Sequence, residues 1–177
     1  MDKNMGVGKA NLTWLLAAVF GSTILLTASW GDSGPASFPS VTHKLTQNEC
    51  AACHMAYPAG LLPARSWTRM MGELDRHFGE DASLSQKEVE QIARYLVDNA
   101  ADTPRANAMM QRIASGIAAS DKPQRFTETR YFSYLHDEVP SGVWKRKGIG
   151  SKSNCVACHT KAEERSFAER EIRIPKN

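Results

Sequence analysis

The sequence predicts an all-α fold organised as two small modules. Two segments, 63–79 and 85–97, place apolar residues three or four positions apart, which is the spacing of a helix with one buried face. No segment shows the alternation of apolar and polar residues that is typical of paired strands. The length of 177 residues allows one domain or two small ones.

The first 31 residues have the layout of an export signal. Lys3 and Lys9 precede an uncharged stretch, residues 10–31, whose apolar centre is 12–28. Seventeen residues of helix span roughly 25 Å, slightly less than a typical bilayer core. We expect residues 1–31 to be a signal peptide that is cleaved or a membrane anchor that is retained. Either form predicts export to the periplasm, in the second case with attachment to the inner membrane.

A short linker and two helices follow this leader. Residues 32–40 are rich in Ser, Gly and Pro and predict a flexible tether. Pro63 is expected to open the first helix and Gly79 to end it. One face of this helix carries Trp67, Met70, Met71, Leu74, His77 and Phe78. A capping box from Ser85 to Glu88 predicts the start of the second helix.

The helical pattern breaks near Pro104, and we place a module boundary there. It separates a first module, residues 41–103, from a second one, residues 104–177. Pro104 is expected in the first turn of a third, connecting helix that ends near Gly116. A short aromatic segment, 131–135, follows a polar connector. The remainder of the second module is expected to be smaller and largely irregular.

All four cysteines lie in two Cys-x-x-Cys-His motifs, at residues 50–54 and 155–159. This motif is the attachment signature of c-type haem: the two thiols form thioethers with one porphyrin, and the adjacent histidine ligates its iron. The sequence therefore predicts two covalently bound haem c groups. The attachment residues are Cys50, Cys53, Cys155 and Cys158, and the proximal iron ligands are His54 and His159.

Other uses of paired cysteines fit less well. Zinc sites usually separate their two pairs by about 15–20 residues, whereas the two motifs here start 105 residues apart. A thioredoxin-like redox site needs only one pair, in a βαβ context. A disulfide framework does not explain the histidine that follows each pair. Haem attachment is the favoured interpretation.

The distal ligand of the second haem is expected upstream of its motif. The eighteen residues after His159 contain neither Met nor His, and the last methionine is Met110. His136 is the nearest candidate, nineteen residues before Cys155. The alternative is that His136 is an ordinary surface histidine beside two acidic residues.

For the first haem, His77 is the favoured distal ligand because it lies on the apolar face of the predicted helix. His43 is the alternative histidine, and ligation by Met109 or Met110 is also open. The remaining methionines of the first helix, Met70 and Met71, are expected to pack in the core.

The charge is distributed unevenly. Residues 41–103 have six Lys and Arg against nine Asp and Glu, whereas residues 140–177 have nine against four. Haem propionates would neutralise part of the positive charge of residues 140–177. The remaining positive charge forms either a solvated face or a docking surface around Lys145-Arg146-Lys147. The formal charge of +3 is too small to indicate nucleic-acid binding.

Several stretches resemble the small periplasmic dihaem cytochromes c. They are 49–54 with Tyr57-Pro58, 61–67, 74–79, 136–140 and 154–159. The resemblance implies a first module similar to a class I cytochrome c and a smaller second module dominated by its haem. It also implies two histidine ligands on each iron, with His77 and His136 in the distal places. The implied partners are an oxygen-binding soluble haem protein and a membrane cytochrome b.

Two side-chain ligands on each iron would leave no coordination position for a substrate. We therefore expect a non-enzymatic, one-electron carrier between a membrane donor and a soluble haem protein or reductase. A dihaem peroxidase with one open iron is an alternative, but such enzymes are usually much larger. A further alternative is an electron-transfer subunit of a periplasmic reductase. Histidine in place of Met as sixth ligand predicts lower reduction potentials.

Overall fold

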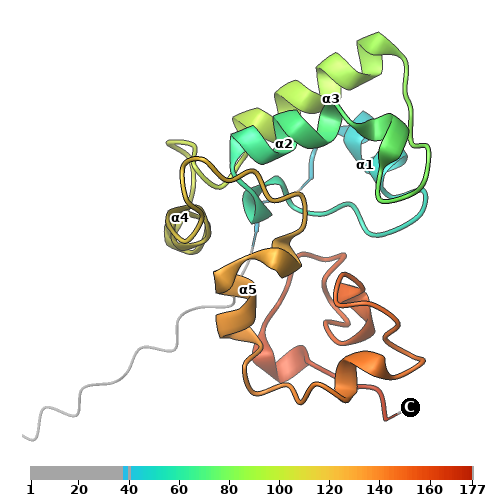
Figure 1. Ribbon diagram of the computed structural model, residues 1–177, viewed down its shortest axis with the longest axis vertical. Coiled ribbons are helices and arrows are strands. Elements are labelled where there is room, and N and C mark those ends of the chain that lie inside the picture. The colour runs from blue at the N-terminus through green and yellow to red at the C-terminus, as the bar shows by residue number, and fades with distance from the viewer. Residues whose placement is uncertain (1–37, 40, 177) are drawn as a thin grey trace, which may run out of the picture. The chain divides into compact units, whose positions relative to one another are not determined.

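The computed structural model describes residues 38, 39 and 41–176 (Figure 1). The expected signal peptide or anchor, 1–31, and most of the expected tether, 32–40, lie outside these described residues. Within the described part, no helix is long and apolar enough to span a bilayer. The same part contains helices and turns but no β-strand, so the prediction of an all-α fold is confirmed.

Five α-helices lie in the described part of the chain, and short 3₁₀ turns join them. They are α1 (Lys44–Cys50), α2 (Ala64–Met71), α3 (Gln86–Asp98), α4 (Ala108–Ser115) and α5 (Arg130–Leu135). Helices α1 and α2 both pack against α3. Helix α4 packs against the 3₁₀ turn Ala59–Leu61, and α5 against the turn Phe126–Glu128.

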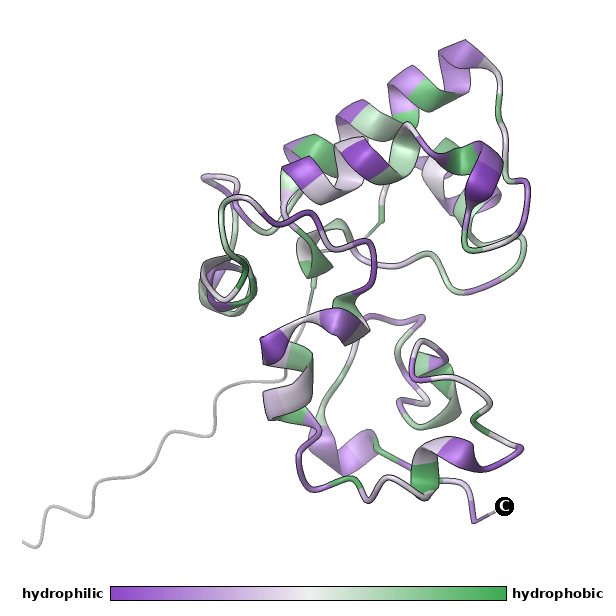
Figure 2. Ribbon diagram, viewed as in Figure 1, coloured by the Kyte–Doolittle hydropathy of each residue, from purple (hydrophilic) through white to green (hydrophobic). Residues whose placement is uncertain are grey.

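The α2–α3 pair is amphipathic, with hydrophilic and hydrophobic residues alternating along both helices (Figure 2). Trp67 of α2 and Ile92 of α3 are buried in one apolar cluster. The indole Nε1 of Trp67 donates a hydrogen bond of 2.7 Å to the carbonyl of Ala59, which satisfies its polar atom inside the core. At the start of α3, Ser85 and Glu88 form the predicted capping box.

The prediction of one helix from Pro63 to Gly79 is wrong in its second half. Pro63 does precede α2, but α2 ends at Met71 and Gly72 caps it. Gly has low helix propensity, and its N–H closes the last turn on carbonyls of α2. His77 therefore lies in a loop with φ −68° and ψ 86°, rather than on a helix face. Gly79 (φ +102°) turns this loop instead of ending the helix.

Helix α4 also begins later than predicted. Pro104 lies in a turn before the helix, and Asn107 is the N-cap, whose side chain accepts a 3.0 Å hydrogen bond from the Met110 N–H. Asp102 and Thr103 could also cap a helix, but the Asp102 carboxylate accepts from the Ala64 N–H and the Thr103 hydroxyl donates to the Ala100 carbonyl. Gly116 caps the C-terminus, so the predicted end is confirmed.

A second apolar cluster joins residues on both sides of the expected module boundary. Leu61 and Ala101 pack there with Met110 and Ile113 of α4. Gly60 permits this approach, because a Cβ at that position would lie 2.7 Å from the Met110 side chain. The two-module organisation itself stays a prediction.

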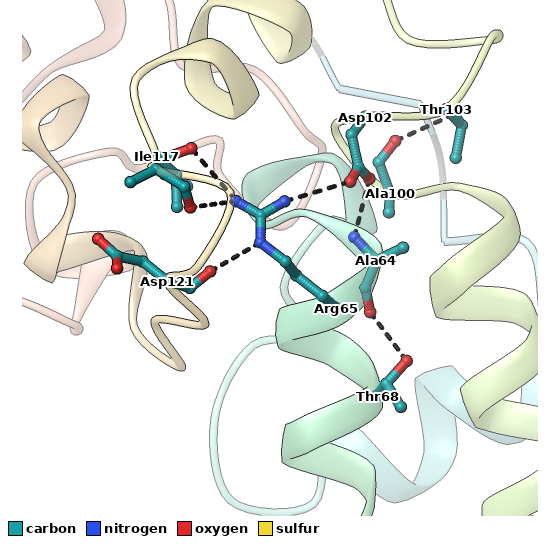
Figure 3. A network of polar contacts seen from close by, with 9 residues as sticks. Ala64, Arg65, Thr68, Ala100, Asp102, Thr103, Ile117 and Asp121 are labelled. Atoms are coloured by element: carbon teal, nitrogen blue, oxygen red, sulfur yellow. Dashed lines mark hydrogen bonds and ion pairs between the residues drawn. The ribbon is translucent and has the colours of Figure 1, made fainter.

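Arg65 ties α2 to the segment that follows α4 (Figure 3). Its guanidinium donates hydrogen bonds of 2.7 Å to the Asp121 carbonyl and 2.9 Å to the Ala118 carbonyl. It also forms a 3.5 Å ion pair with Asp102, which in turn accepts from the Ala64 N–H at the start of α2. One planar side chain thus holds three backbone segments together.

Candidate haem sites

The first site is a pair of histidines from two loops. His54 follows α1 at the end of the first Cys-x-x-Cys-His motif, and His77 lies in the loop after α2. Their ring centres are 6.2 Å apart, and the ring planes differ by 28°. The structure therefore brings together the predicted proximal and distal histidines of the first haem, with their rings nearly parallel.

Hydrogen bonding selects one nitrogen of His54 for a metal. Its Nδ1 lies 2.7 Å from the carbonyl oxygen of Met55. A carbonyl can only accept, so Nδ1 carries the proton and Nε2 keeps its lone pair. The Tyr57 ring packs 4.8 Å from the His54 ring, centre to centre. Burial raises the pKa of the Tyr57 hydroxyl to about 12.

His77 is half-buried and lies among aromatic and cationic groups. Its ring contacts Phe78 at 4.8 Å, and the guanidinium of Arg125 lies 3.8 Å from the centre of the Phe78 ring. Burial, followed by the charges of His54 and Arg125, lowers the pKa of His77. The ring is therefore neutral at pH 7, which is the form that binds a metal.

The second site is a pair of histidines from α5 and the second motif. His136 caps α5, and its Nδ1 donates a 2.9 Å hydrogen bond to the carbonyl of Phe132. The ring of His136 lies 6.0 Å from that of His159, and the two planes are nearly perpendicular, at 82°. As at the first site, the structure brings together the predicted proximal and distal histidines.

Aromatic side chains surround the second pair. The Phe132 ring stacks on His136 at 4.1 Å, and Trp144 lies 5.7 Å from the same imidazole. Phe167 packs 5.2 Å from His159. Burial lowers the pKa of His136 and of His159, so both rings are neutral at pH 7. An open groove beside His136 is lined in part by Trp144 and Lys152.

The C-terminal segment braces the second attachment motif. Residues Cys155–Ala157 form a 3₁₀ turn, and the His159 N–H bonds to the Cys155 carbonyl at 2.8 Å. Arg173 donates from its backbone N–H to the Cys158 carbonyl at 2.8 Å, and Ile172 forms an isolated β-bridge with His159. The orientation of His159 thus depends on residues that follow it in the chain.

The four cysteines are not in disulfides. Burial raises the pKa of Cys50 and of Cys155 to about 11. Within residues 38, 39 and 41–176, no group of three or more His, Cys, Asp or Glu side chains is placed to hold a metal ion.

The spacing of each pair fits an iron held between two imidazoles. A metal–nitrogen bond of about 2.0–2.1 Å, with about 1.2 Å from nitrogen to ring centre, places two opposed rings about 6.4–6.6 Å apart. The observed separations are 6.2 Å and 6.0 Å. Both separations are a few tenths of an ångström below that distance, and each pair lies beside its own cysteine motif.

The alternative ligands of the first haem have other structural roles. His43 is the N-cap of α1: its Nδ1 lies 2.9 Å from the Thr46 hydroxyl, and its ring stacks on Tyr95. Met110 is 2% exposed and packs against Gly60. Met109 packs against the apolar cluster that contains Met110. Met70 and Met71 pack in the α2–α3 cluster, as predicted.

Spacing in the sequence did not reveal several residues that shape the sites. The role of Tyr57 depends on a contact with a segment 96 residues away. The bracing by Ile172 and Arg173 also has no local signature. The aromatic run at 131–135 was the one available signal, since Phe132 belongs to it.

Comparisons with known proteins identify the family. A family model described as dihaem cytochrome c matches residues 46–167. A solved structure of diheme cytochrome c from Rhodobacter sphaeroides is 49% identical, with a TM-score of 0.66, and the match covers 75% of this chain and 100% of that one. The diheme cytochrome c of Shewanella baltica is 35% identical, with a TM-score of 0.60, and covers 75% and 92%. A comparison with curated proteins found no match.

The family match covers more than half of the chain and includes both cysteine motifs. The protein carries two covalently bound haem c groups, and its general function is electron transfer. The chain belongs to the dihaem cytochrome c family.

Proposed function

We propose that the protein is a periplasmic one-electron carrier in which each iron has two histidine ligands. The ligands are His54 and His77 at the first haem, and His136 and His159 at the second. The observation that carries this proposal is the spacing of the two ring pairs, 6.2 Å and 6.0 Å, which suits an iron between opposed imidazoles.

Two ligands on each iron determine the class of reaction. When bound, each haem supplies an iron that gains or loses one electron. With two histidines holding each iron, neither substrate nor oxygen would reach the metal, so peroxidase chemistry is disfavoured. Imidazole as sixth ligand also favours lower reduction potentials than a thioether does.

The chain's own residues hold these ligands in place. The Met55 carbonyl fixes the tautomer of His54, and the Phe132 carbonyl fixes that of His136. Such second-shell bonds orient the ring and raise the basicity of the ligating nitrogen. The Phe132 ring stacks on His136 and Trp144 lies beside it, so both contacts help to fix the orientation of this imidazole.

The leader and the family resemblance support the proposed partners and location. The carrier would take electrons from a membrane cytochrome b and pass them to an oxygen-binding c-type haem protein. It would do so in the periplasm, either free or held at the inner membrane by an uncleaved leader. A fixed subunit of a periplasmic reductase would use the same chemistry with a different partner.

A basic surface is available for docking. Lys145 and Lys147 are exposed, whereas Arg146 donates from Nη1 to the Pro175 carbonyl and is half-buried. An acidic face on the partner would complement the two lysines and speed its association at low salt.

Optical spectra of the purified protein with both haems attached test the carrier proposal. We expect low-spin iron at both haems, no Met-to-iron charge-transfer band and no rapid binding of carbon monoxide. High-spin iron or rapid carbon monoxide binding at either haem would contradict the proposal and favour the peroxidase alternative.

A further inference from the structure

Tyr57 lies between the two haem sites and contacts both. Its ring packs on the ring of His54, with centres 4.8 Å apart and planes 33° apart. Its hydroxyl donates a 2.5 Å hydrogen bond to the backbone carbonyl of Ser153. Because Ser153 is two residues before Cys155, this bond reaches the attachment segment of the second haem.

The Ser153 carbonyl oxygen contacts two side chains. The Sγ atom of Cys155 lies 3.6 Å from the same oxygen that accepts from Tyr57. A continuous series of contacts therefore runs from the His54 ring, through the Tyr57 ring and hydroxyl, to the Ser153 carbonyl and the Cys155 sulfur. One end is the proposed iron ligand of the first haem, and the other is the sulfur that attaches the second.

We propose that Tyr57 couples the two haem sites, by fixing the Cys155 attachment segment against His54 and by supplying the route for electrons between them. This inference rests on the proposed function, since it takes His54 as an iron ligand and electron transfer as the reaction. Tyr57 acts through its neighbours and is a positioning residue.

The transfer that Tyr57 would assist is a simple exchange. One electron leaves the iron of one site, which is oxidised, and arrives at the iron of the other, which is reduced. No proton moves, and Tyr57 is neither oxidised nor deprotonated. Electron tunnelling is faster through bonds and hydrogen bonds than across a gap of the same length, so loss of the hydroxyl should slow the exchange.

The test compares the full chain carrying both haems with its Tyr57→Phe variant. Phe keeps the ring on His54 and removes only the hydroxyl that binds the Ser153 carbonyl. A photoexcited flavin injects one electron, and freeze-quench electron paramagnetic resonance (EPR) follows its redistribution between the haems. We expect transfer to be slowed several-fold in Tyr57→Phe, while the EPR signals of the fully oxidised protein stay unchanged.

Two further variants separate the ring from the hydroxyl. Tyr57→Leu removes both contacts, so it should slow transfer at least as much and also shift the EPR signal of the first haem, whose ligand ring loses its neighbour. The matched control is Tyr134→Phe, because the Tyr134 side chain is 71% exposed. It should change neither the rate nor the spectra.

The outcomes separate this inference from the proposed function. Equal transfer rates in the parent and in Tyr57→Phe, with both irons low-spin, would overturn the role of Tyr57 and leave the carrier proposal intact. A shift of the first haem's EPR signal in Tyr134→Phe but not in Tyr57→Leu would also overturn it. High-spin iron in the parent chain would instead contradict the proposed function.

Discussion

The two histidine pairs have nearly equal spacing but different orientation and support. At the first site the planes of His54 and His77 are 28° apart, and at the second those of His136 and His159 are 82° apart. The hydrogen-bonded imidazole is the motif histidine at the first site and the distal histidine at the second. The same attachment motif thus accompanies two different arrangements of the paired histidine rings.

The cause of this difference is the backbone around each ligand. His54 and His77 lie in loops at the ends of α1 and α2. His136 is instead held by α5 through the Phe132 carbonyl, while His159 is bridged to Ile172. The buried Nδ1 of His159 makes no hydrogen bond within the described part of the chain. Because second-shell bonds tune a ligated metal, we expect the two haems to have unequal reduction potentials.

The largest expected effect is the opening of one haem by His77→Ala. This change should remove the sixth ligand of the first haem, make that iron high-spin and allow it to bind carbon monoxide. The second haem should stay low-spin. Absorbance and EPR spectra check both outcomes, and His43→Ala is the matched control, because His43 caps α1 and is expected to leave both haems closed. A low-spin first haem in His77→Ala would show that another residue is the ligand.

His136→Ala should have the converse effect. It removes a ligand that stacks on Phe132 and bonds to its carbonyl, so the second haem alone should become high-spin and bind carbon monoxide. The same spectra measure this result. If the first haem opened instead, the pairing of the histidines would be wrong.

Arg65→Ala should lower stability without opening either haem. It removes hydrogen bonds from a charged group to the carbonyls of Asp121 and Ala118 (Figure 3), at a cost of about 1–3 kcal/mol. Denaturant unfolding of the protein with both haems measures the loss. The control is Arg112→Ala on the exposed face of α4, which should stay within about 0.5 kcal/mol of the parent. Equal stability of the two variants would exclude this role for Arg65.

The smallest expected effect concerns the capping box of α3. Hydrogen bonds from the side chain and backbone of Ser85 lower the pKa of Glu88. A lowered folded-state pKa gives stability that is present above the unfolded pKa and is lost as the pH falls through the folded one. Between about pH 5 and pH 3, the denaturation midpoint of the parent should therefore fall more steeply than that of Glu88→Ala. The control is Glu90→Ala, on the exposed face of α3, whose denaturation midpoint should change with pH as that of the parent does. Identical pH dependence of the midpoint in all three proteins would contradict the prediction.

Features with a local signature were predictable from the sequence, whereas those made by distant contacts were not. The attachment motifs and the Ser85–Glu88 capping box depend on residues a few positions apart, and both were identified. The prediction of one helix through His77 was wrong, because Gly72 ends α2. The apolar spacing continues past this glycine and led to the prediction of a longer helix. His77 still lies opposite His54, but through a loop.

The link between Tyr57 and Ser153 spans 96 residues, and the bracing of His159 by Ile172 joins a motif to the segment after it. Neither contact leaves a repeat or a spacing in the sequence. Ring orientation is equally inaccessible to pattern analysis, because it depends on the packing of Phe132 and Trp144 around His136.

EPR spectroscopy of the fully oxidised protein with both haems attached tests the central claim most directly. Nearly parallel axial imidazoles give a rhombic low-spin signal, whereas nearly perpendicular ones give a much more anisotropic low-spin signal. The angles of 28° and 82° predict one signal of each kind, in equal amounts. A high-spin signal from either haem would contradict the claim that two histidines close each iron.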